Sequence, residues 1–192
     1  MKFNMGCGHR KLAGFINVDT SVLCEPDEVV DLEVLPWPWP DGCASEIRFI
    51  HSLEHMGQTP SGFLGIMCEI YRLATDGCEI TIHVPHPRHD NFLNDPTHVR
   101  PITAGTLALF DKRLCENALA LGGANTPLAL MLGLDFETVA TETALDEPYF
   151  TRLKSGVLSE ADAYQLLLTQ NNIARELRFV LRARKPKTSS GV

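Results

Sequence analysis

Short runs of apolar and β-branched residues, each ending in polar residues, recur along the first half of the chain. They predict five strands, at residues 2–5, 15–18, 28–32, 46–50 and 79–84. Two later runs in which apolar and polar residues alternate, at 136–143 and 176–183, predict two more strands. The pattern therefore predicts a sheet of seven strands.

The clearest helix lies between the fourth and fifth strands. Thr59 is a suitable N-cap and Pro60 takes the first helical position. Apolar residues follow at helical spacing, namely Phe63, Ile66, Met67, Ile70 and Leu73. Asp76 and Gly77 are expected to end the helix and turn into the next strand. Strand, helix and strand in this order predict a parallel crossover, the unit that builds a sheet covered by helices.

Two further helices are predicted in the second half. One spans 103–121 and ends at Gly122-Gly123, and the other spans 159–171 with Ser159 as its cap. The second falls between the last two strands, so an antiparallel hairpin is expected at the edge of the sheet. By contrast, only residues 7–14 separate the first two strands, whereas a full crossover takes about 10 to 12 residues. A single helical turn is expected there.

Composition and charge narrow the class of protein. At 192 residues the chain fits one domain, predicted at 1–187 with a flexible tail at 188–192. No run approaches the roughly 20 apolar residues of a membrane span, and no secretory leader opens the chain, so a cytoplasmic location is expected. A net charge of −7 argues against a nucleic-acid partner. The 6 cysteines form no Cys-x-x-Cys pair, so reduced thiols and no metal site are expected.

Candidate chemistry begins directly after the first strand, at Gly6-Cys7-Gly8, and continues at Asp19, which closes the second strand. A glycine pair lets the backbone approach a ligand closely, and an acid at a strand end can accept both hydroxyls of a ribose. The dinucleotide fingerprint requires a third glycine three residues on and an acid about 20 residues further. Lys11 takes the third-glycine position and Asp19 comes too early. The pattern favours a ligand with an adenosine and no phosphates.

Over residues 1–110 the order of features resembles that of class I S-adenosylmethionine-dependent methyltransferases. Asn4-Met5-Gly6-Cys7-Gly8 resembles the first motif of that family, Asp19 its ribose-binding acid, and Asp31-Leu32 its acid near the adenine. The run Leu-Pro-Trp-Pro-Trp-Pro-Asp at 35–41 resembles its Leu-Pro-Phe-Pro-Asp stretch. The most specific similarity is His-Ser-Leu-Glu-His at 51–55, which follows the fourth strand.

The resemblance implies an α/β fold: a Rossmann-like three-layer sandwich with a mostly parallel seven-stranded sheet, an antiparallel C-terminal hairpin and an abbreviated N-terminus. It implies S-adenosyl-L-methionine as cofactor and methyl transfer to an oxygen or nitrogen of a small polar acceptor. The cofactor-binding residues that it implies are Asn4, Gly6, Cys7, Gly8, Asp19, Asp31, Leu32, Ile50 and His51. Trp37 and Trp39 are expected to pack in or beside the core rather than stack on the adenine.

Two positions depart from the pattern of the family. Asn4 stands where the family often has an acid that steers the methionine end of the cofactor. Thr75-Asp76-Gly77-Cys78 stands where the family has Lys-Pro-Gly-Gly, and it keeps one glycine for the turn. Neither departure removes the cofactor site that the resemblance implies.

A histidine-rich loop follows the fifth strand. Ligands of open α/β sheets bind outside the carboxyl ends of the strands, so this loop is expected to face the transferable methyl group and to cover the pocket. His98 is the predicted general base, with Asp95 orienting it and His86 as a further catalytic candidate. Hydrogen bonds that only order the loop are the alternative role of His98. The residues expected to bind substrate are Arg88, His89 and Arg100.

Two alternative functions remain open. In a metal-dependent hydrolase, the ligands would come from His83, His86, His89, Asp90, Asp95 and His98, although Pro85 and Pro87 impose an extended path that opposes convergence. A non-catalytic cofactor-binding protein, or an assembly partner of another methyltransferase, agrees with the abbreviated N-terminus. A small-molecule substrate is expected, and an incompletely covered pocket suggests a homodimer.

Overall fold

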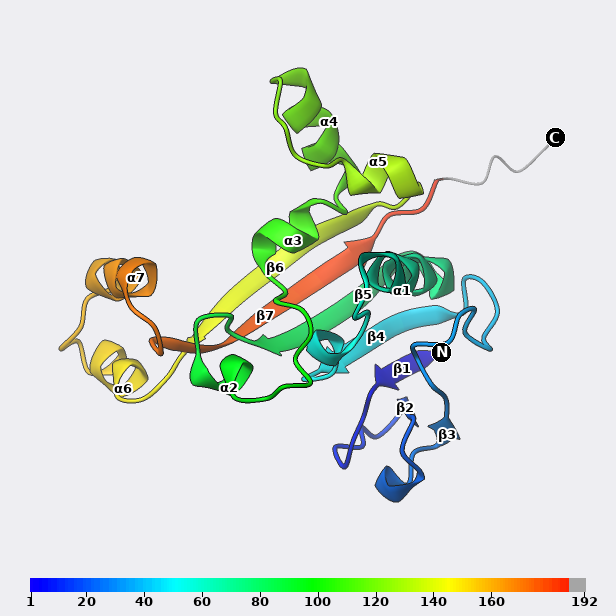
Figure 1. Ribbon diagram of the computed structural model, residues 1–192, viewed down its shortest axis with the longest axis horizontal. Helices are drawn as coiled ribbons and strands as arrows, with labels where there is room; N and C mark the ends of the chain where they lie inside the picture. Colours follow the sequence, from blue (N-terminus) through cyan, green and yellow to red (C-terminus); the bar gives the residue numbers. More distant parts are fainter. Residues whose placement is uncertain (187–192) are drawn as a thin grey trace.

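Seven strands form one sheet in the order β3-β2-β1-β4-β5-β7-β6 (Figure 1). The computed structural model describes residues 1–186, so the tail predicted at 188–192 lies outside the described residues. The strands are β1 (Lys2–Met5), β2 (Ile16–Asp19), β3 (Glu28–Val29), β4 (Ala44–Ile50), β5 (Ala74–Pro85), β6 (Phe136–Leu145) and β7 (Ala174–Ala183). The first five are parallel, and β7 runs antiparallel to both β5 and β6. This arrangement confirms the mostly parallel sheet with an antiparallel C-terminal hairpin.

Helix α1 (Pro60–Leu73) begins as the sequence predicts, because the side chain of Thr59 accepts a hydrogen bond from the amide of Gly62. Its end differs from the prediction. Ala74 already has extended backbone angles and pairs with Ala44 of β4, so β5 starts without a loop. Gly77, with φ of +77°, lies inside β5 and does not end the helix.

The helix predicted at 103–121 is divided into α3 (Ala104–Ala108) and α4 (Lys112–Ala120). Each part has its own cap: Thr103 accepts from the amide of Thr106, and Asp111 accepts from that of Leu114. Fully buried Phe110 separates the two helices and joins the main core, which explains the break. The sequence did not predict α2 (Asp90–Leu93), α5 (Leu128–Leu132) or α6 (Tyr149–Lys154).

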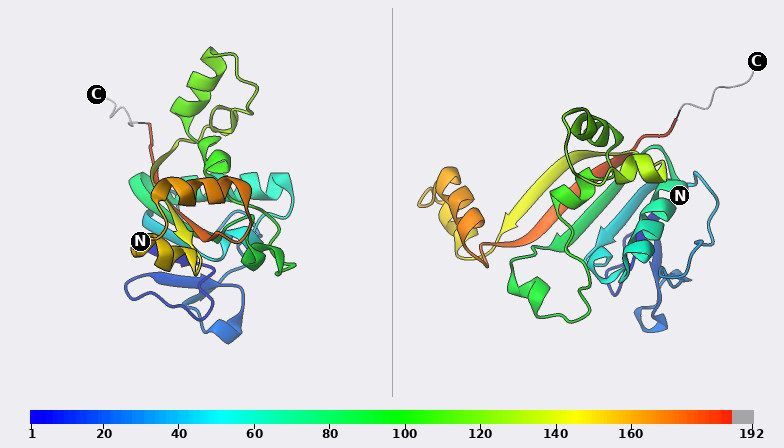
Figure 2. Two further views of the ribbon diagram at one scale, coloured as in Figure 1. Left: turned by 90° about the vertical axis from the view of Figure 1, so that its left-hand side faces the viewer. Right: turned by 45° about the horizontal axis from the view of Figure 1, so that its top comes forward.

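The two faces of the sheet differ. Helices α1 and α3 cover one face (Figures 1 and 2), against which the apolar side chains of the strands pack. On the opposite face, residues in register across the strands are mostly polar: Lys2, Glu46, Arg48, Glu79, Thr81, Arg182 and Glu137.

The predicted three-layer sandwich would have helices on both faces of the sheet. The connections between the first four strands explain why the polar face differs from this prediction. Within residues 1–50, these connections hold loops and the short 3-10 helix η1 (Val22–Cys24), but no α-helix. Part of the opposite face is covered instead by the loop at 9–15. Phe15 at the end of this loop lies under the cationic side chains of Lys2 and Arg48, whose charged ends are 5.6 and 4.7 Å from its ring centre. The polar side chains elsewhere on this face need no apolar cover.

Helices α6 and α7 (Glu160–Thr169) extend beyond the end of the β6–β7 hairpin (Figure 1). They enclose a separate small core around Leu145, Leu158 and Ile173. Ser159 caps α7 as predicted, because its hydroxyl accepts from the amide of Asp162. Across the described residues, helices fall short of the length and apolar content that a membrane span requires.

Candidate functional site

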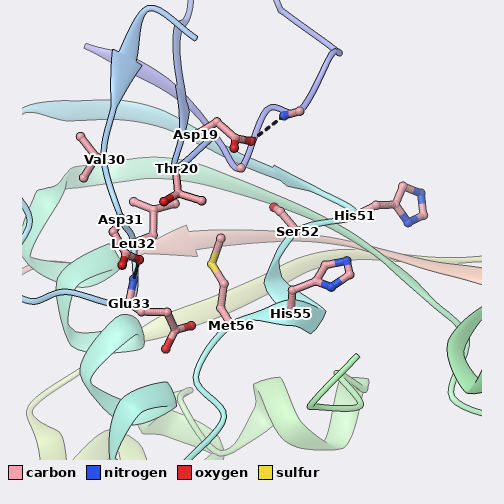
Figure 3. Close-up of a pocket in the computed structure, with 12 residues that line it drawn as sticks. Asp19, Thr20, Val30, Asp31, Leu32, Glu33, His51, Ser52, His55 and Met56 are labelled. Carbon is pink, nitrogen blue, oxygen red and sulfur yellow. Dashed lines mark hydrogen bonds between the residues drawn. The ribbon is translucent and has the colours of Figure 1, made fainter. Parts of the chain in front are cut away.

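A cavity of about 350 Å³ opens at the carboxyl ends of β1, β2, β3 and β4 (Figure 3). This is the edge of the sheet at which the sequence predicts a ligand. The lining residues are Gly6, Gly8, Asp19, Thr20, Val30, Asp31, Leu32, Glu33, His51, Ser52, His55 and Met56. Six of the nine predicted cofactor-binding residues, namely Gly6, Gly8, Asp19, Asp31, Leu32 and His51, are therefore brought together.

Gly6 allows the ends of β1 and β4 to approach each other closely. Its φ is +67°, and a Cβ atom there would lie 2.5 Å from the Cβ of Ser52. The buried Ser52 hydroxyl donates a 2.7 Å hydrogen bond to the carbonyl of Met5, which fixes this approach. The wall of the cavity is consequently backbone, with no side chain on the strand end to occupy it.

Backbone amides hold the two acids of the cavity. Asp19 accepts from the amide of Gly8 at 2.8 Å and from that of Ser21 at 2.9 Å, and Asp31 accepts from the amide of Glu33 at 3.0 Å (Figure 3). A carboxylate has about four lone-pair positions, so each acid keeps capacity to accept hydroxyl or amino protons of a ligand. The two carboxylates are therefore ordered before any ligand arrives.

The other three predicted cofactor residues do not line this cavity. Asn4 is buried on the polar side of the sheet, where its amide donates to the carbonyl of Arg10 and to the side chain of Asn17. Cys7 is also buried, its amide donates to the carbonyl of Val18, and burial raises the pKa of its thiol. Ile50 is half-buried on the polar face. Asn4 instead fixes the loop that leads from β1 to β2.

Trp37 and Trp39 pack in the core, as predicted, with 2% and 7% of their surfaces exposed. The indole of Trp37 donates to the carbonyl of Leu32, and its amide donates to the carboxylate of Glu69 on α1. Glu69 also forms a bidentate pair with Arg72. This network supports the cavity wall at Leu32 from behind.

A second cavity of about 390 Å³ adjoins the first, because His51 and His55 line both. Its remaining lining residues are Glu54, Pro85, Asn91, His98, Arg175 and Glu176. In Figure 3, the rings of His51 and His55 lie on the side of the first cavity away from Asp31 and Leu32. The second cavity is therefore polar, and it lies next to the first on the side of His51 and His55.

The histidine-rich loop reaches this second cavity through backbone contacts with the 3-10 helix η2 (Leu53–His55). The amides of Val99 and Arg100 both donate to the carbonyl of Glu54, at 2.9 and 3.2 Å. His98 is thereby placed beside His55, with 4.6 Å between ring centres, and only 8% of its side chain is exposed. The structure thus brings one predicted catalytic residue, His98, to the site.

Asp95 is less directly connected to His98 than the sequence suggested. Its carboxylate accepts from the amide and the hydroxyl of Thr97, which lowers its pKa, and it lies 3.9 Å from Nε2 of His98. That distance is too long for a hydrogen bond. Instead, Nδ1 of His98 lies 2.9 Å from the carbonyl of Phe92, which orients the imidazole.

The remaining predicted residues lie elsewhere. His86 and Arg88 line a separate cavity with Thr103 and Thr141. His89 is buried, and its Nε2 lies 3.0 Å from the carboxylate of Asp146.

Arg100 donates to the carbonyl of Gly57 and stacks on Phe63. Of the six candidate metal ligands of the hydrolase alternative, only His98 belongs to a group whose ligand atoms converge within the described residues.

That convergent group, Glu54, His55 and His98, includes two residues that the sequence did not single out, Glu54 and His55. Glu54 lies inside the motif at 51–55, so its position directly after the fourth strand was the available signal. His51 has a φ of +56°, which is uncommon outside glycine and often marks a functional site. The nearby carboxylate of Glu54, 3.7 Å from Nδ1 of His51, is the main factor that raises the pKa of His51, and Nε2 of His51 lies 2.9 Å from Glu176.

Comparison with known proteins gives a likeness in structure but none in sequence. No protein-family model matches the sequence, and no curated protein matches it. The fold is similar to an S-adenosylmethionine-dependent methyltransferase of Archaeoglobus fulgidus, with a TM-score of 0.60 and 19% identity, over 94% of this chain and 84% of that one.

Two further structures show the same architecture. The [4+2]-cyclase SpnF matches with a TM-score of 0.55 and 15% identity, over 96% of this chain and 75% of its own. The 1,6-didemethyltoxoflavin-N1-methyltransferase of Burkholderia thailandensis, solved with bound S-adenosylhomocysteine, matches with a TM-score of 0.51 and 12% identity, over 95% and 70%. The chain therefore has the fold of class I S-adenosylmethionine-dependent methyltransferases.

Proposed function

We propose that this protein transfers a methyl group from S-adenosylmethionine to an oxygen or nitrogen of a small polar acceptor. The observation that carries the proposal is the first cavity. Two ordered carboxylates, Asp19 and Asp31, and a glycine-lined backbone wall meet there at the carboxyl ends of the strands. Together with the methyltransferase architecture, these groups suit a nucleoside with free ribose hydroxyls.

Each residue of the first cavity has a role in this proposal. Asp19, held by two amides, accepts the ribose hydroxyls. Asp31 accepts from the adenine amino group, and the buried side chain of Leu32 packs against the base. Gly6 and Gly8 leave room for the ligand to approach the backbone. The residues present fit this cofactor, because Asp19 and Asp31 line the cavity and each retains lone pairs to accept further hydrogen bonds.

The second cavity takes the acceptor. It adjoins the first at His51 and His55, and its lining of imidazole, carboxylate and amide groups suits a small polar molecule. When bound, the cofactor would supply a methyl sulfonium. The acceptor lone pair would form a bond to the methyl carbon as the carbon–sulfur bond breaks, and sulfur would keep that electron pair. Positioning the acceptor atom about 3 to 3.5 Å from that carbon provides most of the rate.

His98 receives the acceptor proton in this proposal. Its Nδ1 lies at hydrogen-bonding distance from the carbonyl of Phe92, so Nδ1 carries the hydrogen in the neutral ring and Nε2 keeps a lone pair. Nε2 lies 4.0 Å from the buried Glu54 carboxylate, on the side of the second cavity. The imidazolium that forms would therefore be stabilised by a nearby negative charge.

Calorimetry with S-adenosylhomocysteine tests the cofactor site. The wild-type protein is expected to bind this product in the micromolar range and to give no heat with NAD. Asp19→Asn is expected to remove the binding heat, since the ribose loses its acceptor. Asp41→Asn is the matched control, because the Asp41 side chain is 82% exposed and lies outside both cavities. Comparable heat with NAD, or unchanged binding by Asp19→Asn, would contradict the proposal.

Turnover must be tested separately, because one protein with this architecture is a [4+2]-cyclase. A panel of small hydroxyl and amine compounds would be incubated with S-adenosylmethionine, and S-adenosylhomocysteine formation would be measured. His98→Gln is expected to bind the product normally while turnover of any active acceptor falls. If the wild-type protein binds the cofactor but methylates none of the panel, the non-catalytic alternative replaces this function.

A further inference from the structure

The carboxylate of Glu54 is the most unusual polar group in the described part of the molecule. Only 1% of its side chain is exposed, and neither carboxylate oxygen has a hydrogen-bond partner among the described residues. A buried carboxylate is costly unless it is paired, hydrogen-bonded or coordinated to a metal. The nearest imidazole nitrogens, Nδ1 of His51 and Nε2 of His98, lie 3.7 and 4.0 Å away. These distances leave a gap at the carboxylate that a further group would fill.

Two of the imidazoles near this carboxylate, those of His55 and His98, each have Nδ1 at hydrogen-bonding distance from another group. Nδ1 of His98 lies 2.9 Å from the carbonyl of Phe92. Nδ1 of His55 lies 2.9 Å from the hydroxyl of Thr97, which itself donates to Asp95 at 2.6 Å. Since the Thr97 proton is used on Asp95, Nδ1 of His55 must be the donor. Nε2 of both rings therefore keeps a lone pair.

This is the hydrogen-bond pattern of metal-ligating histidines. Such residues almost always donate their other ring N–H to a carbonyl, carboxylate or water, which fixes the tautomer and the orientation of the ring. Glu54, His55 and His98 each offer a ligand atom, and these atoms lie within 4.8 Å of one another. Ligands of a zinc ion lie about 2.0 to 2.2 Å from the metal, so small side-chain rotations would close the site.

We propose that Glu54, His55 and His98 bind a divalent transition-metal ion, with Zn²⁺ the expected ion, in the second cavity. Two imidazoles and one carboxylate form the ligand set of several catalytic zinc sites, in which a fourth position stays open for water or substrate. The open position would face the cavity that Asn91 and Glu176 also line. Arg175 contributes a cationic side chain to the same cavity, which suits an anionic acceptor bound beside the metal.

One consequence rests on the proposed function. A metal beside the methyl donor would bind the acceptor oxygen or nitrogen and lower its pKa, so that the acceptor would give its proton to solvent water before the transfer. His98 would then act as a ligand rather than as the base. Metal binding itself requires no cofactor, so the two proposals can fail separately.

Titration of Zn²⁺ into chelator-treated protein, without cofactor, tests the site. The wild-type protein is expected to bind one equivalent per chain. Glu54→Gln and His98→Gln are each expected to weaken binding by more than roughly 100-fold, beyond the 10- to 100-fold typical of outer partners. His86→Gln is the matched control, because His86 lies on the same loop but lines a different cavity. No binding by the wild type, or equal losses in all three variants, would overturn the proposal.

Cobalt provides a second readout, because the chain has 6 cysteines that could bind zinc adventitiously. Bound Co²⁺ is expected to show visible d–d bands without the intense charge-transfer band that thiolate ligands add. A thiolate band in the wild-type protein that persists in Glu54→Gln would place the ion on cysteines and overturn the proposal. Asp19→Asn is expected to keep the cobalt spectrum, which separates failure of the cofactor site from failure of the metal site.

Thermal unfolding distinguishes a variant that has lost a metal ligand from one that has failed to fold. In metal-free protein, Glu54→Gln removes a buried charge that lacks a partner, so its melting temperature is expected to equal or exceed that of the wild type. Zn²⁺ is expected to raise the melting temperature of the wild type and of His86→Gln but not of Glu54→Gln, because only a native-state ligand stabilises the fold. A zinc-dependent rise in Glu54→Gln would contradict the assignment.

Discussion

The two adjoining cavities differ in how their polar groups are satisfied. In the first, backbone amides hold the carboxylates of Asp19 and Asp31. In the second, the buried carboxylate of Glu54 has no hydrogen-bond partner among residues 1–186, and ligand atoms of His55 and His98 lie within 4.8 Å of it. The carboxylates of the first cavity have hydrogen bonds even when no ligand is bound. The carboxylate of Glu54 in the second cavity has none, so its burial is not compensated. On this difference rest the two proposals, a dissociable nucleoside in the first cavity and a tightly held ion in the second.

The largest effect is expected from Gly6→Ala, which acts on the first cavity alone. The new Cβ would lie 2.5 Å from that of Ser52 and would sit on a residue with φ of +67°. Strain and steric conflict together should lower the free energy of unfolding by about 3 kcal/mol and abolish binding of S-adenosylhomocysteine. Chemical denaturation and calorimetry measure the two effects.

Gly14→Ala separates the two causes. Gly14 has a φ of +79°, but a Cβ there would meet nothing within 4 Å. This variant should therefore show the cost of backbone strain without the cost of the clash. Equal losses in both variants would mean that the close approach of β1 and β4 at Ser52 does not shape the cavity. Zinc binding should survive in Gly14→Ala.

Glu69→Gln should have the next largest effect, because it weakens the support behind Leu32. Arg72, and then the Trp37 amide, lower the pKa of Glu69 against the opposing effect of burial. Replacement should lower the free energy of unfolding by about 2 kcal/mol at neutral pH. A lowered folded-state pKa means that this stabilisation exists above the unfolded value of about 4.3 and disappears as pH falls through the folded value.

Denaturation at a series of pH values checks the prediction for Glu69. The wild type and Glu69→Gln should differ most near pH 7 and converge under acidic conditions. Exposed Glu79 provides the control, since Glu79→Gln should change stability little at any of these pH values. If the difference in stability between the wild type and Glu69→Gln instead grew as the pH fell, the Glu69–Arg72 pair would not have the stabilising role assigned to it.

Ser52→Ala should have the smallest effect of the three. It removes one buried hydrogen bond, from the Ser52 hydroxyl to the carbonyl of Met5, and should cost about 1 kcal/mol. Ser45→Ala is closely matched, because the Ser45 hydroxyl donates to the carbonyl of Met1 in an exposed position. Equal costs for the two serines, measured by denaturation, would show that burial of this hydrogen bond between the ends of β1 and β4 adds nothing to stability.

Much of the fold could be predicted from local patterns. The apolar runs located all seven strands, and Thr59 with Pro60 located the start of α1, because caps and periodicity depend on neighbouring residues. The break at Phe110 could not be predicted, since it depends on a core contact with distant residues. The missing helices on the polar face could be suspected only from the short connection at 7–14.

The candidate site divides in the same way. Gly6, Gly8, Asp19 and Asp31 were predictable because each follows its own strand, and parallel strands deliver their ends to one edge. The arrangement around Glu54 was not predictable. It depends on two backbone hydrogen bonds that bring the segment at 95–100 onto η2, more than 40 residues away in the chain.

The sequence by itself determined the order of the strands along the chain, the helix that joins β4 to β5, and the glycines and acids of the first cavity, since all of these follow from local residue patterns. Only the tertiary structure decided which histidine faces the site. His86, His89 and His98 lie within one loop, yet only His98 reaches Glu54 and His55. The physical reason is that long-range backbone bonds and burial, not spacing in sequence, fix where a loop places its side chains.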